Sequence, residues 1–567
     1  MLQAWLAFST LLLAALPGAA MAGIPSSGLH ANGLNPPGLI SCLSERIRKV
    51  SLLKIVDQTD DGFHNASYIR NLYTRKNFQP QVIVFPESTE DVEQIVKATQ
   101  ACRDFLPAKA TSVFSVLSGG HNYAGYCLSN GIVVNMEKMN TVHWDFPKRQ
   151  VTVGMGVRWR DIYPHIEGTG LIAVGGGCPD VGVGGFVLGG GWSWMSRSYG
   201  LGSDNLLEAD VVLANGQTVT VNDEIVSNSR DTHLADLWFS LRGAGGGNFG
   251  IVTRMVLQLR QLRTNVGLNG QVCWTLDRAK EPLNRYKDWL LTKPFYFGAP
   301  VILSNMFGER RYCITVVHNG DPEEGFNLLQ PMFSLMPDYV SLARNDLSTF
   351  EVLMDGNGAS TNDAGRTYTN SLIIMKENFT SELVDVLIQG VNDGPNQKDT
   401  IVFHEGGGYF AAVPSNATAF PYRDLFVVIQ VNAIWDSDGE TSTNVAWADT
   451  LVNRINKFSS GSYVNYMNGK MKNQNVKYYG SNLPRIQRTK DHYDPSNLFA
   501  FPSGIDATPG SGTASNRDHA ATALGTVSVC GPHEAAAAHC WDSKLPGRQE
   551  WAPSELEPRS VSSGSES

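Results

Sequence analysis

The chain has 567 residues, of which 42% are hydrophobic and 17% are charged, so it has a globular composition and can bury large cores. At about 150 residues each, this length allows roughly three or four domain-sized units. The net charge of −9 and the lack of a basic tract argue against nucleic acid or an anionic membrane as a partner.

The N-terminus has the pattern of a secretory signal. An apolar run over residues 4–16 is too short to span a bilayer comfortably, and small residues follow it up to Ala20-Met21-Ala22. This A-x-A pattern predicts cleavage after residue 22, although no Lys or Arg precedes the apolar run. No later stretch is long and apolar enough for a membrane span. We therefore expect residues 1–22 to be removed and the mature protein to be extracellular, without a membrane partner.

Two further features agree with export. Sequons for N-glycosylation occur at Asn65, Asn378 and Asn416. An oxidising compartment also allows disulfides, although spacing alone does not reveal their connectivity. The cysteines available for them are Cys42, Cys102, Cys127, Cys178, Cys273, Cys313, Cys530 and Cys540.

After an N-terminal segment, residues 23–76, short strands and helices alternate. Residues 81–85 predict a buried strand that ends at Pro86. Ser88 and Asp91 then form a capping-box pattern, and apolar residues follow at helical spacing. Further strands are expected at residues 113–117, 132–135 and 150–153, and a short helix at 159–166.

Residues 175–205 are the most unusual stretch, with eleven glycines among Val, Phe, Leu and Trp. Glycine lacks a Cβ and allows positive φ, so this backbone could approach a flat or phosphorylated ligand closely. Cys178 at the head of the loop could bond a cofactor. A tight buried turn with a core cysteine explains the pattern equally well, so this stretch alone leaves both interpretations open.

Residues 209–213 and 218–221 predict a β-hairpin around Asn215-Gly216, a pair suited to a type I′ turn. A helix is expected at residues 234–241 and a strand at 251–259. Residues 81–259 thus form an α+β unit with three glycine-rich loops.

The loop at residues 245–250 matches G-x-G-x-x-G. A Rossmann fingerprint follows a strand and opens a helix, whereas here a helix precedes the loop and a strand follows it. We therefore reject NAD binding through this motif. The loop can still offer backbone N–H groups to a pyrophosphate.

From about residue 263 to 445, strand-like and helical runs alternate again, which indicates a second domain. Residues 446–505 carry a helix and a segment rich in Tyr and Asn. Residues 506–567 shift to Ala, Gly, Ser, Thr and Pro without an apolar period, so we expect a disordered tail. Cysteines and histidines between Cys530 and Cys540 have the residue types of a zinc site but no hydrophobic frame, so no metal site is expected.

Short motifs occur in order along residues 40–505. They are SGGHNYAG at 118–125, GCPDVGVGG at 177–185, GGG at 189–191, RSYGL at 197–201, LRG at 241–243, GNFGIVT at 247–253, YVNY at 463–466, YYGSN at 478–482 and YDPSN at 493–497. In these motifs the chain resembles the berberine-bridge-enzyme-like flavoprotein oxidases. They belong to the wider family whose flavin domain is named after p-cresol methylhydroxylase.

The resemblance implies FAD held by two covalent bonds, from His121 to the flavin 8α carbon and from Cys178 to C6. A lone histidine is more often structural, but Gly-Gly-His and Gly-Gly-Cys at strand-to-loop junctions of one unit support each other. The resemblance also places Asn497 near the flavin, so both ends of the chain should build the FAD-binding domain. The expected cofactor contacts are Ser118, Gly119, Gly120, Asn122, Val181, Gly182, Gly185, Gly189, Gly190, Gly250, Ile251 and Asn497.

The resemblance also implies three catalytic residues. Tyr466 matches the family's general base, Tyr123 an active-site tyrosine, and Gln430 a position where relatives have a Glu or Gln facing the substrate. Because a tyrosine has an ordinary pKa near 10, a neighbour must lower the pKa of Tyr466 for it to act near neutrality. Structural alternatives remain: Tyr463 and Tyr466 could be core aromatics, and Gln430 a buried strand residue.

Two positions bear on the flavin chemistry. Phe186 stands where many relatives have a histidine that can hydrogen-bond the cofactor, so the tuning of the flavin is expected to differ. Val181 matches relatives that react with O2, whereas a larger Leu there is linked to a slow oxygen reaction. This favours an oxidase over a dehydrogenase.

We therefore expect an α+β fold. A two-part FAD-binding domain of the p-cresol methylhydroxylase type, residues 77–262 and 446–505, would hold an inserted α+β substrate domain on an antiparallel sheet, residues 263–445. The expected enzyme transfers a hydride from an alcohol-type or secondary-metabolite small molecule to flavin N5, and O2 accepts the electrons to give H2O2. The alternatives are an oxidase acting on the anomeric carbon of oligosaccharides, and a flavin-binding protein without turnover.

Overall fold

The computed structural model describes residues 38–48, 53–105, 113–305, 308–349, 365–506 and 508. The expected signal peptide and nearly all of the expected tail, with its cysteines and histidines, lie outside these residues. Within them, no helix is both long and apolar enough to cross a membrane.

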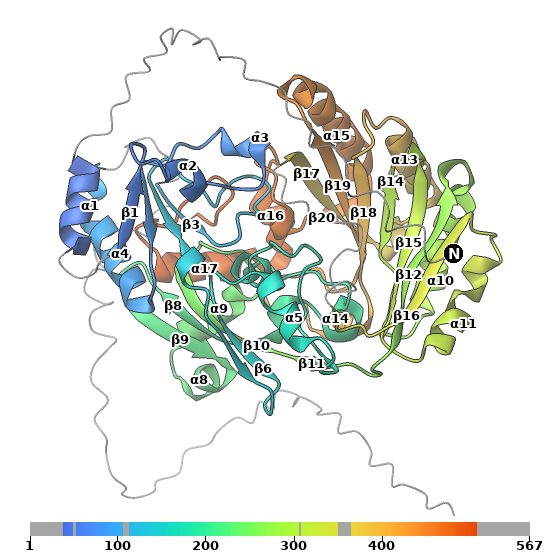
Figure 1. The fold of residues 1–567 in the computed structure, drawn as a ribbon, viewed down its shortest axis with the longest axis horizontal. Coiled ribbons are helices and arrows are strands. Elements are labelled where there is room, and N and C mark those ends of the chain that lie inside the picture. Colours follow the sequence, from blue (N-terminus) through green and yellow to red (C-terminus); the bar gives the residue numbers. More distant parts are fainter. Residues whose placement is uncertain are drawn as a thin grey trace, which may run out of the picture. The chain divides into compact units, whose positions relative to one another are not determined.

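The N-terminal half is built on two kinds of sheet (Figure 1). In the first, β2, β4 and β3 run parallel and β1 is antiparallel to β2. Its order is β1 (Lys54–Asp57), β2 (Val82–Phe85), β4 (Ile132–Asn135) and β3 (Phe114–Leu117). The second is antiparallel, in the order β5 (Val142–Asp145), β6 (Gln150–Gly154), β10 (Ile251–Gln258), β8 (Leu206–Val212) and β9 (Thr218–Asn222). A short pair joins β7 (Leu171–Ile172) to β11 (Arg260–Gln261).

The chain after residue 263 forms one large antiparallel sheet, which confirms the expected α+β class. Its order is β16 (Tyr339–Asn345), β12 (Gly267–Thr275), β15 (Arg311–His318), β14 (Val301–Ser304), β18 (Thr400–Glu405), β19 (Leu425–Trp435), β17 (Arg366–Met375) and β20 (Ser459–Gly461), with β13 (Phe297–Gly298) beside β15. The central strand β19 is buried along almost its whole length, because its Val, Ile and Leu side chains are covered on both faces.

Helices occur in both parts of the fold, and several of them cover one face of the large sheet. The helices are α1 (Gly38–Arg48), α2 (Phe63–Ala66), α3 (Leu72–Arg75), α4 (Thr89–Ala101), α5 (Tyr163–Ile166), α6 (Val183–Leu188), α7 (Ser196–Tyr199), α8 (Asp223–Asn228), α9 (Thr232–Leu241), α10 (Lys280–Leu291), α11 (Pro322–Phe333), α13 (Ser381–Asn392), α14 (Gly408–Ala412), α15 (Thr441–Ile455), α16 (Gln474–Tyr479) and α17 (Leu483–Tyr493). Side chains of α10, α13 and α15 share a core with Ile401 and Phe403 of β18 (Figure 1). Because strand side chains alternate, Val402 and His404 point to the opposite face.

The C-terminal segment returns to the N-terminal half. Helix α17 packs on α9, and Ile486, Tyr493 and Leu498 join the core that contains the β5–β10 sheet. The same segment contributes β20 to the edge of the large sheet. The residues after 458 therefore touch both parts of the fold.

The local prediction at Ser88 is confirmed, and that at Asn215 is partly wrong. Ser88 Oγ accepts from the Asp91 N–H and the Asp91 carboxylate accepts from the Ser88 N–H, which is the capping box. Strands β8 and β9 form the expected hairpin, but Leu213 pairs with Gln217, so the loop has three residues. Gly216 has φ of +75° whereas Asn215 does not have positive φ, and a type I′ turn needs both. The Asn215 side chain instead accepts from the Gln217 N–H at 2.9 Å, which favours an Asx turn.

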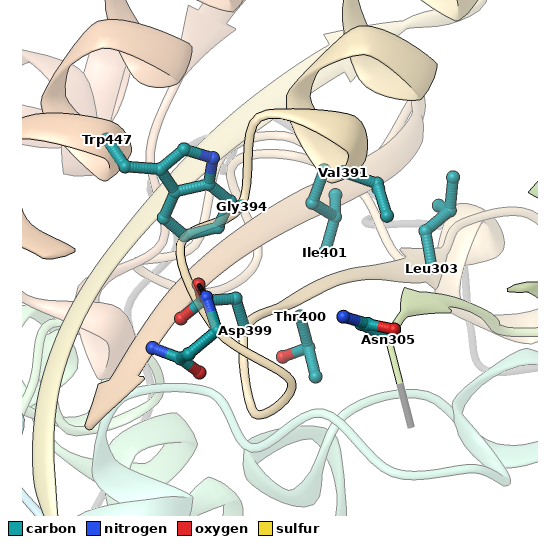
Figure 2. Close-up of a pocket in the computed structure, with 9 residues that line it drawn as sticks. Leu303, Asn305, Val391, Gly394, Asp399, Thr400, Ile401 and Trp447 are labelled. Carbon is teal, nitrogen blue, oxygen red and sulfur yellow. Dashed lines mark hydrogen bonds between the residues drawn. The ribbon is translucent and has the colours of Figure 1, made fainter. Parts of the chain in front are cut away.

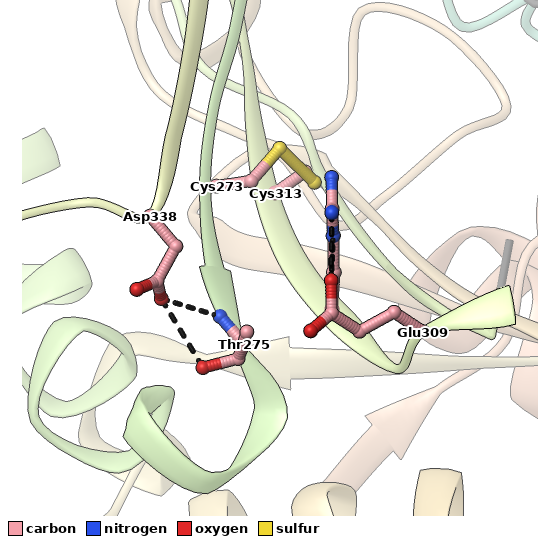
Figure 3. Close-up of a disulfide and its surroundings, with 6 residues drawn as sticks. Cys273, Thr275, Glu309, Cys313 and Asp338 are labelled. Atoms are coloured by element: carbon pink, nitrogen blue, oxygen red, sulfur yellow. Dashed lines mark hydrogen bonds and ion pairs between the residues drawn. A yellow bond between two sulfur atoms is a disulfide. The ribbon is translucent and has the colours of Figure 1, made fainter. Parts of the chain in front are cut away.

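Two disulfides form among the described cysteines. Cys42–Cys102 ties α1 to the end of α4, and Cys273–Cys313 joins directly paired residues of β12 and β15 (Figure 3). The second pairing depends on strand register, which cysteine spacing does not reveal.

Candidate active site

Four side chains form a hydrogen-bonded network on the face of β18 and β19 that the helices leave uncovered. The Tyr466 hydroxyl lies 2.9 Å from His404 Nε2, and this nitrogen lies 3.1 Å from Gln430 Oε1. Gln430 Nε2 reaches the Tyr123 hydroxyl at 3.4 Å. The structure thus brings the three predicted catalytic residues together. It adds His404, which the sequence analysis missed because it looks like an ordinary strand residue.

Tyr466 is held in place by its neighbour Tyr463. Both lie at the short 3₁₀ helix η10 (Val464–Tyr466). Tyr463 is 1% exposed, and its hydroxyl accepts from the Gly191 N–H at 2.7 Å. Its own N–H donates to Ser371 Oγ of β17 at 3.0 Å. Tyr463 is therefore the buried anchor, as the core-aromatic alternative required, while Tyr466 stays half-buried.

Gln430 is oriented from within its own sheet. Its Nε2 donates to Asn432 Oδ1 at 2.9 Å, and that oxygen also accepts from Thr369 Oγ1 at 2.9 Å. Asn432 Nδ2 donates to Thr400 Oγ1 at 3.1 Å. Gln430 is thus a buried strand residue and a member of the network at once.

Burial keeps the network neutral. It raises the pKa of Tyr466 well above its ordinary value, and Tyr123, Tyr463 and Cys178 add to this effect. Burial likewise raises the pKa of Tyr123 to about 12 and lowers the pKa of His404 to about 4. Burial and these three side chains therefore act against the expected lowering of the Tyr466 pKa, and no cation faces its hydroxyl among its described hydrogen-bond partners.

The two proposed attachment residues lie beside this network and beside a charged cluster. The negative charge of an ionised Cys178 would raise the pKa of Tyr123 and of Tyr466, so Cys178 lies near the two tyrosines. Burial, followed by the charge of Arg70, lowers the pKa of His121 to about 3. His121 is accordingly a neutral imidazole at neutral pH.

Asp180 gathers three arginines near His121. Arg70, Arg158 and Arg160 approach its carboxylate to 3.1, 3.7 and 2.5 Å. Arg160 also lies 4.0 Å from the Asp161 carboxylate, so two carboxylates share the three guanidinium groups. Arg158 also lines a cavity of about 300 Å³ at the carboxyl ends of β3 and β4, together with Asn65, Tyr68, Leu117, Ser118, Gly119, Asn135 and Glu137.

Several observations fit a bound FAD. A cavity of this size next to a glycine loop and an arginine suits a nucleotide diphosphate. Asn497 has φ of +51° and its buried Oδ1 has no hydrogen-bond partner, so the polar atom is available to a ligand. A Cβ added to Gly185 would meet nothing within 4 Å, so space lies above this backbone. The residues present therefore fit the cofactor.

Contacts within the protein explain why several other expected cofactor residues are glycines. A Cβ on Gly119 would lie 2.1 Å from the Gly182 nitrogen, and one on Gly182 would lie 2.5 Å from the Gly119 nitrogen. The two loops thus touch through their backbones. Gly189 leaves room for Asn465, and Gly250 for the Val212 carbonyl.

The remaining expected contacts lie in the same loops. Gly120 and Gly190 have φ of +73° and +114°, which favour glycine. Ser118 Oγ donates to the Met155 carbonyl at 2.6 Å. The Asn122 side chain accepts from the Tyr126 N–H at 3.1 Å, Val181 is half-buried, and Ile251 is buried at the start of β10.

Phe186 fills an internal space. Its ring meets Trp159 edge to face at 5.2 Å, and a Cβ on Gly191 would touch it at 2.4 Å. The phenyl group therefore packs against protein, which explains how an apolar side chain is accommodated there.

A buried ion pair positions the Asn497 turn. Lys490 and Asp494 are both 0% exposed and lie 2.7 Å apart. Asp494 accepts from the N–H groups of Leu498 and Phe499, while Lys490 donates to the Asn248 carbonyl in the glycine loop 245–250. The pair thus fastens the C-terminal turn to that loop, a role that the sequence did not suggest.

A second cavity is too small for a substrate (Figure 2). It lies between α13, α15 and β18 and has a volume of about 10 Å³, enough for about one water molecule. Burial raises the pKa of Asp399, which lines it, to about 6. Across the described residues, no group of His, Cys, Asp and Glu is arranged to hold a metal.

Comparison with known proteins supports an FAD-linked oxidoreductase. The family model described as "FAD binding domain" matches residues 80–222, and "Berberine and berberine like" matches residues 462–506. The FAD-linked oxidoreductase YgaK of Bacillus subtilis is 26% identical over 459 residues, 80% of this chain and 96% of the relative. The xylooligosaccharide oxidase of Thermothelomyces thermophilus is 26% identical over 465 residues, 76% of this chain and 88% of the relative.

The fold is similar to that of a solved chitooligosaccharide oxidase. The TM-score is 0.71 at 21% identity, covering 83% of this chain and 100% of the other. The matched segments include the glycine loops at residues 118–125 and 175–205 and the Tyr466 and Asn497 motifs, which come from distant parts of the sequence. The chain therefore has the FAD-binding and berberine-bridge-enzyme-like domains of an FAD-linked oxidoreductase.

Proposed function

We propose that this protein is an oxidase of a neutral, hydroxyl-bearing small molecule. The observation that carries the proposal is the network of Tyr123, Gln430, His404 and Tyr466, which offers a phenol and an amide beside Cys178 without a charged side chain among its members. Such a surface suits a substrate alcohol, because it can hydrogen-bond a hydroxyl and accept its proton.

FAD, when bound, supplies the hydride acceptor and passes the electrons to O2, which yields H2O2. Tyr466 takes the proton of the substrate hydroxyl, and Tyr123 and Gln430 orient that hydroxyl. Trp192, Phe410 and Phe420 form a buried aromatic cluster behind Tyr463 and Tyr466, which keeps water from this side of the tyrosines.

The substrate class has two candidates. An alcohol-type or secondary-metabolite substrate fits the half-buried, uncharged network. An oligosaccharide oxidised at its anomeric carbon is favoured by the similarity to the xylooligosaccharide oxidase. A panel of both classes, read by H2O2 release, separates them. If flavin-loaded protein releases H2O2 with neither class, the remaining function is flavin binding without turnover.

We also propose that FAD is attached through His121 and Cys178. The neutral imidazole and the half-buried thiol are nucleophiles of the required kind. After acid precipitation, yellow colour should stay with the pellet of the wild type and of each single variant, His121→Ala and Cys178→Ala. A double variant that still retains covalent flavin would disprove this attachment.

The protein is further proposed to be secreted and N-glycosylated. The two disulfides suit an oxidising compartment, and Asn65 and Asn416 are exposed. Expression of the full chain in a fungal host should deliver protein to the medium that begins near residue 23. Treatment with a glycosidase should reduce its mass, and an unchanged mass would remove the glycosylation proposal.

A further inference from the structure

His404 Nε2 lies between two oxygen atoms. Tyr466 Oη is 2.9 Å away and Gln430 Oε1 is 3.1 Å away. Among the described residues, His404 is the hydrogen-bond partner of the Tyr466 hydroxyl. If Nε2 carries a proton, it can donate to these oxygens, and if it carries none, it can only accept from the Tyr466 hydroxyl. The tautomer of His404 therefore decides whether it is a donor or an acceptor toward Tyr466.

The neighbouring amides assign that tautomer. Gln430 Nε2 donates to Asn432 Oδ1, and Asn432 Nδ2 donates to Thr400 Oγ1. With its amide nitrogen used in this way, Gln430 turns its carbonyl oxygen to the histidine. A carbonyl oxygen only accepts, so the proton lies on His404 Nε2.

We propose that His404 is a positioning residue whose single Nε2–H is shared between Gln430 Oε1 and the oxygen of Tyr466, and that it thereby stabilises the tyrosinate that acts as the base. The inference rests on the proposed function. A hydrogen bond to an anionic oxygen is roughly twice as strong as one to a neutral oxygen, so the donor favours the ionised form. It does so as a neutral imidazole, since burial keeps His404 unprotonated at neutral pH.

The other groups that face Tyr466 act in the opposite direction. Tyr123, Tyr463 and Cys178 all favour its neutral form, as burial does. Glu405, the next residue of β18, is on the opposite face, where it accepts from the Ala299 N–H. His404 thus supplies what the sequence analysis expected without locating, a neighbour that lowers the pKa of Tyr466 relative to its burial alone.

The first test does not need a substrate. In flavin-loaded protein containing ¹⁵N-labelled histidine, NMR reports which ring nitrogen of His404 carries the proton, with the signal assigned by its loss in His404→Gln. We expect a protonated Nε2. A proton on Nδ1 instead would overturn the proposal, because Nε2 could then only accept from Tyr466.

The second test is the pH profile of anaerobic flavin reduction by the substrate that the panel identifies. His404→Leu should shift the acid limb upward by about one unit, which slows reduction about tenfold below the limb and little above it. His404→Gln, whose amide N–H can reach the same oxygen, should shift it less. The control His143→Leu removes an exposed histidine of β5 and should match the wild type.

The outcomes separate the inference from the function on which it rests. Equal slowing at every pH in both His404 variants would mean that His404 is merely structural, and the proposal would fail. If no compound reduces the wild-type flavin, the proposed function fails, while the NMR result still decides whether His404 is a donor.

Discussion

The glycine loops and the large sheet build the candidate site in different ways. In the loops, Gly119 and Gly182 bring two backbones into contact, and Gly189 and Gly250 make room for neighbouring protein atoms. In the sheet, β18 and β19 position Gln430 and His404 through hydrogen bonds between side chains. The proposed cofactor side is therefore fixed mainly by backbone shape, and the proposed substrate side mainly by buried polar groups.

The ion pair of Lys490 and Asp494 is the strongest challenge to that comparison, because it fastens a glycine loop through buried charge. Lys490→Met should lower the free energy of unfolding by about 3–5 kcal/mol, since it leaves the Asp494 carboxylate buried without its cation. Chemical unfolding of the flavin-loaded protein measures this. The double variant with Asp494→Asn should recover part of the loss, and a single variant of wild-type stability would show that the loops hold without the pair.

The two tyrosines of the YVNY motif test the substrate side. Tyr466→Phe should slow anaerobic flavin reduction by about 10²- to 10⁴-fold, because a general base is lost. Tyr463→Phe should instead cost about 1–3 kcal/mol of stability, because the buried Gly191 N–H loses its acceptor. Stopped-flow reduction and thermal unfolding separate the two effects. Equal slowing in both variants would contradict the assignment of base and anchor.

The same contrast explains what the sequence could predict. Glycines report places where a backbone must come close to something, so the loops around His121 and Cys178 and the two ends of the cofactor domain were visible as motifs. His404 and Lys490 have no such signal, because a histidine in a strand and a lysine in a helix are common. Their roles depend on register and on contacts between distant segments, such as His404 with Tyr466, 62 positions apart. The pairing of Cys273 with Cys313 was hidden for the same reason.

Glu405 shows that the sheet also buries a carboxyl group. Burial raises its pKa from 4.5 to about 7, although Arg197 acts in the opposite direction. A folded-state pKa above the unfolded one means that the folded protein binds the proton more tightly, so this group's contribution to stability falls as pH rises from about 4.5 to about 7. The shift corresponds to about 3 kcal/mol at most.

Glu405→Gln should remove this dependence. The free energy of unfolding of the variant relative to the wild type, measured by urea unfolding at several pH values, should increase between about pH 4.5 and pH 7 and then level off. Burial also raises the pKa of Asp399, and both proteins contain this residue. Its contribution cancels in the difference between their free energies of unfolding, so this difference is the quantity to follow. A difference that does not change with pH would show that Glu405 is not a buried titrating group.

A pair of glycines gives the smallest expected effects and the sharpest test of the loops. Gly119→Ala forces apart two backbones that a Cβ would approach to 2.1 Å, so it should cost about 1–3 kcal/mol and lower the flavin content. Gly185→Ala adds a Cβ that meets no protein atom within 4 Å, in a helix where alanine is favoured, so the stability of the flavin-free protein should be unchanged or slightly higher. Its flavin content should nevertheless fall if this space belongs to FAD, as absorbance after purification would report. Full flavin content in Gly185→Ala would show that this glycine does not contact the cofactor. A loss of flavin without a loss of stability would show that Gly185 makes room for a ligand, whereas Gly119 allows two loops to touch.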